Sequence, residues 1–172
     1  MLLFFVYMKK SLSLLALSLM LVPACASDEE NKEEQGQQEE VEVSSEDSLE
    51  QKVAKFNEYS AQNPFFFAFD SSVVKDQNLV SAYAKAMNEL GADAKYTING
   101  YCDNRGSVEY NNALGMRRAN AVKVSLQNKG IDSKMKVSTI SYGKNKFQNY
   151  YKDVEKNQQA NRKVEIVAEI NK

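Results

Sequence analysis

The stretch from Asp28 to Glu50 sets the limits of any folded domain in this 172-residue chain. It contains eleven acidic residues against one lysine, and it has no aromatic residue. Such a segment cannot bury enough apolar surface to offset the entropy of ordering its backbone, so we expect a disordered tether. The folded part therefore follows it, in about 120 residues, which is enough for one domain.

The residues before the tether have the pattern of a secretory signal. Lysines at positions 9 and 10 precede the uncharged apolar stretch 11–22. That stretch is too short to span about 30 Å of hydrocarbon, but its length is typical of a signal-peptide core. Met8 directly precedes the lysines, so the natural start is either Met1 or Met8.

The signal ends in Leu21-Val22-Pro23-Ala24-Cys25, which resembles a bacterial lipobox. A lipobox implies cleavage after residue 24 and lipidation of Cys25, and Ala26 at the next position implies sorting to the outer membrane. Attached acyl chains would anchor the chain stably there, since each buried methylene contributes about 0.8 kcal/mol. The alternative is an ordinary secretory signal in which Cys25 has no special role.

These features divide the chain into a signal peptide (1–24), a lipidated cysteine with an acidic tether (25–52) and a folded domain (53–172). Residues 51–172 hold 19 Lys and Arg against 12 Asp and Glu, a net charge of +7. A basic domain favours an anionic partner. Because a secreted, lipid-anchored chain does not meet nucleic acid, an anionic cell-wall polymer is the better candidate.

Composition also argues against most enzyme classes. The chain has no histidine, which excludes Ser-His-Asp and Cys-His catalysis and disfavours most catalytic zinc sites. Two cysteines cannot form a four-ligand structural metal site, and no metal or cofactor is expected. A wall-cleaving glycosidase remains as an alternative, with Asp70, Asp103 and Glu109 as its possible carboxylates.

The folded part shows alternating strand and helix patterns. The aromatic run Phe65–Phe69 predicts a buried strand, and apolar residues at helical spacing predict a helix over 73–90. Further strands are expected at 95–102, 135–142 and 163–170, a second long helix from about 107 to 129, a polar loop over 143–161 and a weak extra helix at 51–62. The order β-α-β-α-β-β predicts a two-layer α+β sandwich with a mixed four-stranded sheet.

Arg118 is the main anomaly of the second long helix, because a helical wheel places it on the apolar stripe together with Asn111. A guanidinium that faces a core needs an anionic partner, either Asp103 as a structural ion pair or a ligand. A break near Gly115 would put Arg118 in a first helical turn, where free backbone amides add to an anion site. Asp103, Asn111 and Arg118 would then suit a zwitterionic amino-acid group, and near-normal melting of Arg118→Ala would indicate a ligand site.

Several motifs in order now resemble the OmpA-like peptidoglycan-binding domain over about residues 64–170. They are Gly100-Tyr101-Cys102-Asp103-Asn104-Arg105-Gly106-Ser107, Arg117-Arg118-Ala119-Asn120-Ala121-Val122, Ser141-Tyr142-Gly143-Lys144 and Asn161-Arg162-Lys163-Val164. The resemblance implies that Asp103 and Arg118 hold the diaminopimelate side chain of the peptidoglycan stem peptide. It further implies that Asn111 supports them and that Arg162 matches the first arginine of the family's late Asn-Arg-Arg motif.

The chain departs from the family pattern in four places. Tyr101 replaces the usual histidine, Cys102 the usual threonine, Asn99 a frequent glutamate and Lys163 the second arginine. The main acid–arginine pair is intact, so the resemblance still implies binding. With Cys102 in place of threonine, the chain lacks a hydroxyl beside Asp103. With Lys163 in place of arginine, it lacks a guanidinium that could donate two parallel hydrogen bonds.

With its lipobox and tether, the chain has the layout of a lipoprotein of the outer membrane whose domain faces the periplasm and binds peptidoglycan without catalysis. The resemblance implies TolB and the other Tol-Pal proteins as further partners. A lipoprotein of the same family that works outside the Tol-Pal system is the alternative.

We predict that Cys25→Ser releases the protein from membranes, because no other segment of the mature sequence is apolar enough to hold it there. Fractionation followed by carbonate extraction measures the effect. A Cys25→Ser protein that still sediments with outer membrane after extraction contradicts the lipid anchor. Cys102→Ser, the matched control, should fractionate like the wild type.

Overall fold

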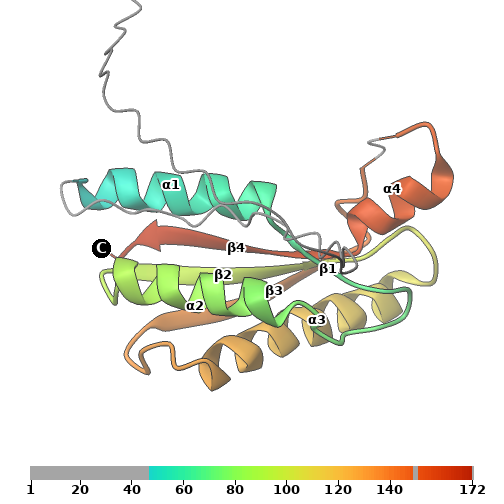
Figure 1. The fold of residues 1–172 in the computed structure, drawn as a ribbon. Helices are drawn as coiled ribbons and strands as arrows, with labels where there is room; N and C mark the ends of the chain where they lie inside the picture. Colours follow the sequence, from blue (N-terminus) through green and yellow to red (C-terminus); the bar gives the residue numbers. More distant parts are fainter. Residues whose placement is uncertain (1–46, 149–150, 172) are drawn as a thin grey trace, which may run out of the picture. The chain divides into compact units, whose positions relative to one another are not determined.

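The computed structural model describes residues 47–148 and 151–171. The signal peptide, Cys25 and most of the tether lie outside the described residues. The elements run in the order α1 (Leu49–Gln62), β1 (Phe65–Phe66), α2 (Gln77–Leu90), β2 (Ala94–Tyr101), α3 (Val108–Asn128), β3 (Lys136–Gly143), α4 (Val154–Asn161) and β4 (Lys163–Ile170) (Figure 1). Within the part described, no helix has the length and apolar character needed to cross a bilayer.

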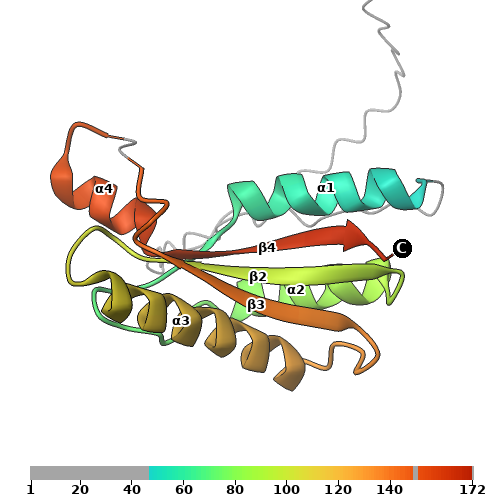
Figure 2. The same ribbon diagram turned by 180° about the vertical axis from the view of Figure 1, so that it is seen from behind.

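The four strands form one mixed sheet in the order β1-β4-β2-β3, in which β2 and β3 are parallel and the other pairs antiparallel. One face of the sheet packs against α2 and α3, and the view from behind shows the strands in front of α2 (Figure 2). The predicted two-layer α+β fold is confirmed, and so is the extra helix expected at 51–62, which is α1; α4 was not predicted.

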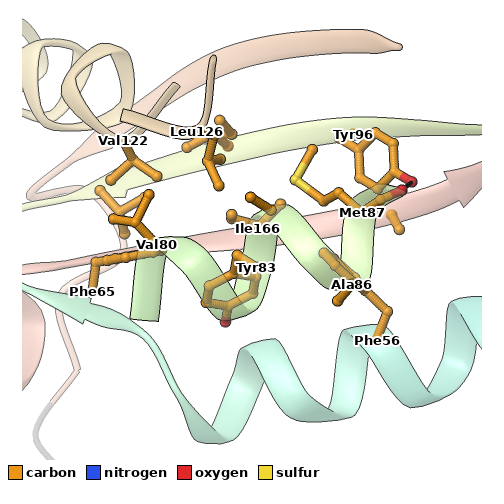
Figure 3. Close-up of a cluster of buried hydrophobic side chains, with 14 of the residues drawn as sticks. Phe56, Phe65, Val80, Tyr83, Ala86, Met87, Tyr96, Val122, Leu126 and Ile166 are labelled. Atoms are coloured by element: carbon orange, nitrogen blue, oxygen red, sulfur yellow. Dashed lines mark hydrogen bonds between the residues drawn. The ribbon is translucent and has the colours of Figure 1, made fainter. Parts of the chain in front are cut away.

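The core lies between the sheet and the helices. Alternate residues of β2 and β4 point into it, as the period of a strand requires. Tyr83 and Met87 of α2 meet Leu126 of α3 and Ile166 of β4 there (Figure 3). This packing fixes α3 against β2 and β3, and so positions Arg118 within α3 close to the residues that follow β2.

Helix α1 begins at Leu49, inside the range 25–52 that the sequence pattern assigns to the tether. Ser48 and Gln51 form a capping box that starts the helix there. The helix then covers the edge of β4: the Asn57 amide pairs with both the N–H and the C=O of Ala168, and Ser60 Oγ accepts from Ile166 N. These bonds satisfy a strand edge that would otherwise be open to pairing with other chains.

Two expectations about local structure are wrong. The aromatic run is not a continuous buried strand, because only Phe65 and Phe66 pair with β4. Its side chains alternate from Phe65 to Phe67, with Phe66 exposed between two buried rings, and Phe69 beyond them is exposed as well. The predicted polar loop 143–161 contains α4, which starts at the side-chain cap of Asp153.

The expected break near Gly115 is also wrong, since α3 runs without interruption from Val108 to Asn128. Gly115 instead lets the helix approach the sheet closely. A Cβ atom on Gly115 would lie 2.3 Å from Ser141 Oγ, and one on Gly100 would lie 2.0 Å from the Gly115 carbonyl oxygen. The missing side chains therefore set the distance between α3 and β2.

We predict that Gly100→Ala destabilises the domain by about 3 kcal/mol or more, because its methyl group would overlap backbone atoms of α3. Thermal melting should show a midpoint roughly 10 °C lower. Gly115→Ala should cost less, and Ser141→Ala should recover part of that loss, because the Ser141 hydroxyl is the nearest atom in the way. A Gly100→Ala protein with wild-type melting would show that α3 does not pack this closely.

Candidate ligand-binding site

A cavity of about 150 Å³ lies at the end of the sheet where β2 leads into α3 and the segment after β1 passes by. All four residues that the sequence predicts for the site line it: Asp103, Asn111, Arg118 and Arg162. Its other lining residues are Phe69, Asp70, Cys102, Arg105, Gly106, Tyr110 and Leu114. The structure thus brings the predicted residues together, although their contacts differ from those expected.

Arg118 is fully buried in the middle of α3, with an exposed fraction of 0%. Its Nε donates to Ser71 O at 2.8 Å, Nη1 to Tyr101 O at 2.9 Å and Nη2 to Ala68 O at 3.1 Å. Nη1 also donates to Cys102 Sγ at 3.4 Å. The ion pair with Asp103, one of the two alternatives that the sequence left open, is not formed, and carbonyl and sulfur acceptors bind the guanidinium instead. The expected place of Arg118 in a first helical turn is wrong.

This arrangement leaves the charge of Arg118 without a carboxylate of any described residue in contact. Four of its N–H groups are bonded, and the second N–H of Nη2 makes no hydrogen bond to a described residue. Burial lowers the pKa of the guanidinium from its usual value, because removing it from water disfavours the charged form. A ligand carboxylate in the cavity would supply the missing anion.

Asp103, at 4% exposed, follows the end of β2 and pairs with two other arginines. Its Oδ2 accepts from Arg105 Nη2 at 2.5 Å, Arg105 Nε at 3.2 Å and Arg162 Nη1 at 3.2 Å, and its Oδ1 accepts from Arg105 N at 3.2 Å. Although burial alone would raise the pKa of Asp103, these hydrogen bonds lower it, so the carboxyl is ionised at neutral pH.

Arg162 and Asn111 hold the framework of the cavity. Arg162 is buried, and its Nε donates to Phe67 O at 3.0 Å, so it ties Asp103 to the segment after β1. The Asn111 amide donates to Arg105 O at 2.6 Å and to Ser107 O at 2.9 Å, and thereby shapes the loop after Asp103. Arg162 thus holds Asp103 directly, and Asn111 positions it through the loop that follows.

The rim is made of residues that were not predicted to belong to the site. Phe69 is 61% exposed and lies under the Arg105 guanidinium, with 4.1 Å from Arg105 Cζ to the ring centroid. The Tyr110 hydroxyl donates a hydrogen bond to Asp70, which has a positive φ of 52°. Arg105 belongs to a recognised motif and could have been found from it. Phe69 looked like a core residue.

The charges favour an anionic or zwitterionic ligand, since three arginines and two aspartates line the cavity. The carboxyls do not resemble the acid of a glycosidase, which needs a raised pKa. The pKa of Asp103 is lowered, and hydrogen bonds from its own backbone amide and from Ser107 lower that of Glu109. Within residues 47–148 and 151–171, no group of His, Cys, Asp and Glu could hold a metal ion.

Comparison with known proteins gives consistent results. A model of the OmpA family matches residues 66–162. The peptidoglycan-associated lipoprotein of Legionella pneumophila is 38% identical over 116 residues, which cover 64% of this chain and 65% of the relative. The protein of the same name from Haemophilus influenzae is 42% identical over 86 residues, 49% of this chain and 55% of the relative. The chain thus matches less than two thirds of the length of either relative.

The fold of this chain is also similar to that of solved structures. The peptidoglycan-associated lipoprotein from Burkholderia pseudomallei is 32% identical with a TM-score of 0.56, over 63% of this chain and 92% of that one. The C-terminal domain of Helicobacter pylori MotB, at 22% identity and a TM-score of 0.54, covers 63% of this chain and 85% of that one. At that identity, MotB supports the fold alone.

We predict that Arg118→Ala lowers the free energy of unfolding by about 3–5 kcal/mol, because the carbonyls of three residues lose their donor. The expectation that near-normal melting would mark a ligand site is therefore wrong, since Arg118 bonds these carbonyls whether or not it also binds a ligand. Arg118→Lys should lose less, since an ammonium can still reach some of these acceptors. Arg117→Ala, the matched control on the exposed side of the helix, should change stability by less than about 0.5 kcal/mol. Denaturant titration measures all three, and an Arg118→Ala protein as stable as the wild type would contradict the structural role.

Proposed function

Because the chain belongs to the OmpA family, we propose that its folded domain, residues 53–172, binds peptidoglycan non-covalently through the stem peptide. The observation that carries this proposal is the buried Arg118 guanidinium, which lines the cavity and has an N–H without an acceptor among the described residues. Asp103 lines the same cavity as an ionised carboxylate.

The two charges suit the diaminopimelate side chain, which ends in a carboxylate and an ammonium on one carbon. In this proposal Arg118 binds the carboxylate and Asp103 accepts from the ammonium. Cys102 and Asn111 also line the cavity and bond each other, and Arg162 holds Asp103 in place. Hydrogen bonds between charged groups in a desolvated pocket are strong, so a few of them are enough to bind the stem peptide of peptidoglycan.

The wider role follows from the order of the parts along the chain. We propose that Cys25 carries the lipid, that the acidic segment before α1 spans part of the periplasm, and that the domain links the outer membrane to the wall. The names of the relatives, peptidoglycan-associated lipoproteins, support this role. No catalytic step is proposed, because the lowered pKa of Asp103 suits ligand binding better than acid catalysis.

Pull-down with isolated peptidoglycan tests the binding. We predict that Asp103→Asn, which keeps the shape of the side chain but removes its charge, weakens binding at least about tenfold. Arg117→Ala should bind like the wild type. A soluble stem peptide that contains diaminopimelate should compete for the wild-type protein.

Circular dichroism must first show that Asp103→Asn is folded. Wild-type binding by folded Asp103→Asn, or failure of the soluble peptide to compete, would contradict this site.

We further propose that the protein is the Pal component of the Tol-Pal system, with TolB as a partner and a role in envelope integrity and cell division. The alternative is an OmpA-family lipoprotein outside that system. Capture from envelope extract with the full-length protein separates the two, and TolB is expected among the captured proteins. If TolB is absent while peptidoglycan binding persists, the alternative is correct.

A further inference from the structure

We propose that the Arg105 guanidinium occupies the ammonium position at Asp103 in the unliganded protein and is displaced when a ligand binds. This inference rests on the proposed function, because it concerns the same cavity. Arg105 then competes with a ligand ammonium for Asp103. It weakens the binding of ligands that carry an ammonium and strengthens the binding of ligands that carry only the carboxylate.

The two arginines that hold Asp103 differ in their exposure. The Arg162 side chain is 8% exposed and also bonds Phe67 O, so it is a fixed part of the frame. The Arg105 side chain is 39% exposed, yet it donates two of the hydrogen bonds to Asp103 Oδ2. Arg105 is therefore the partner that can leave.

The Arg105 guanidinium occupies Oδ2 of Asp103 and repels any cation placed on Oδ1. Asp103 therefore accepts from a ligand ammonium without that repulsion only if Arg105 moves. Its Oδ1 accepts a single bond among the described residues, from Arg105 N, and so retains capacity for another donor. An ammonium there would lie close to the Arg105 guanidinium on the neighbouring oxygen, and two cations at that distance repel each other in a partly buried site.

Other contacts of Arg105 would hold its side chain after it leaves Asp103. The Phe69 ring already lies beneath the guanidinium at 4.1 Å, and Glu155 Oε2 is 3.7 Å from Nη1. Both groups are exposed. The guanidinium can thus move outward while it keeps an aromatic face and a carboxylate as partners, which lowers the cost of displacement.

The loop does not depend on the Arg105 side chain for its shape. Its backbone N–H bonds Asp103 Oδ1, and its carbonyl accepts from the Asn111 amide. Both bonds use backbone atoms, so they remain when the side chain is replaced. Arg105→Gln therefore removes the competing charge and leaves the Asp103 loop in place.

Calorimetric titration of the full-length mature protein tests the proposal with two probes. One is a stem peptide containing diaminopimelate. The other is the same peptide with 2-aminopimelate in its place, which keeps the side-chain carboxylate but lacks the adjacent amino group. Arg105→Gln is compared with Arg117→Gln, which removes an exposed arginine that faces the Tyr110 ring instead of a carboxylate in the cavity.

We expect Arg105→Gln to bind the diaminopimelate peptide about fivefold more tightly, the size of one exposed ion pair. The same variant should bind the 2-aminopimelate peptide more weakly than the wild type, because Arg105 adds positive charge beside that ligand's carboxylate. Arg117→Gln should shift both affinities in the same direction by less than about twofold.

Weaker or unchanged binding of the diaminopimelate peptide by folded Arg105→Gln would overturn the competitor role, and the proposed function would stand as long as the wild type binds that peptide. If the wild type and both variants bind neither peptide, the proposed function and the role of Arg105 both fail.

Discussion

The buried guanidinium of Arg118 is the interaction on which the end of this domain depends. It joins three segments that are distant in sequence, because it bonds the carbonyls of Ala68 and Ser71 after β1 and of Tyr101 at the end of β2, while its own backbone belongs to α3. Removing such a cation from water is costly, and well-packed hydrophobic residues in its place often give a protein the same stability or more. We infer that the charge is retained because it also serves a ligand.

The close contact of α3 with the sheet makes this arrangement possible. Gly100 and Gly115 let the helix lie directly on β2, so Arg118, about one turn further along, reaches carbonyls on both sides of the strand end. Arg162 bonds Asp103 directly, and Asn111 holds the loop that follows it. The rim differs from this frame, because Phe69 and Arg105 are exposed and can adapt to a ligand.

Much of the fold was predictable from the sequence. Helical and strand periodicity predicted the sheet, α2 and α3, and the wheel placed Arg118 and Asn111 on the buried side, as the structure confirms. The partners of Arg118 were not predictable, because backbone carbonyls leave no mark in a sequence. Gly115 was misread as a break, since a glycine for close packing and a glycine for a turn look the same. The short helix α4 was missed because its residues are mostly polar.

Observation of Arg118 itself tests its ligand-binding role most directly. In ¹H–¹⁵N spectra of arginine side chains, its buried and bonded N–H groups should exchange slowly with water and give resolved signals in the free protein. Titration with a diaminopimelate stem peptide should shift these signals, and Arg117 should stay unaffected. If the peptide binds but the Arg118 signals do not move, the ligand carboxylate lies elsewhere and the central claim is wrong.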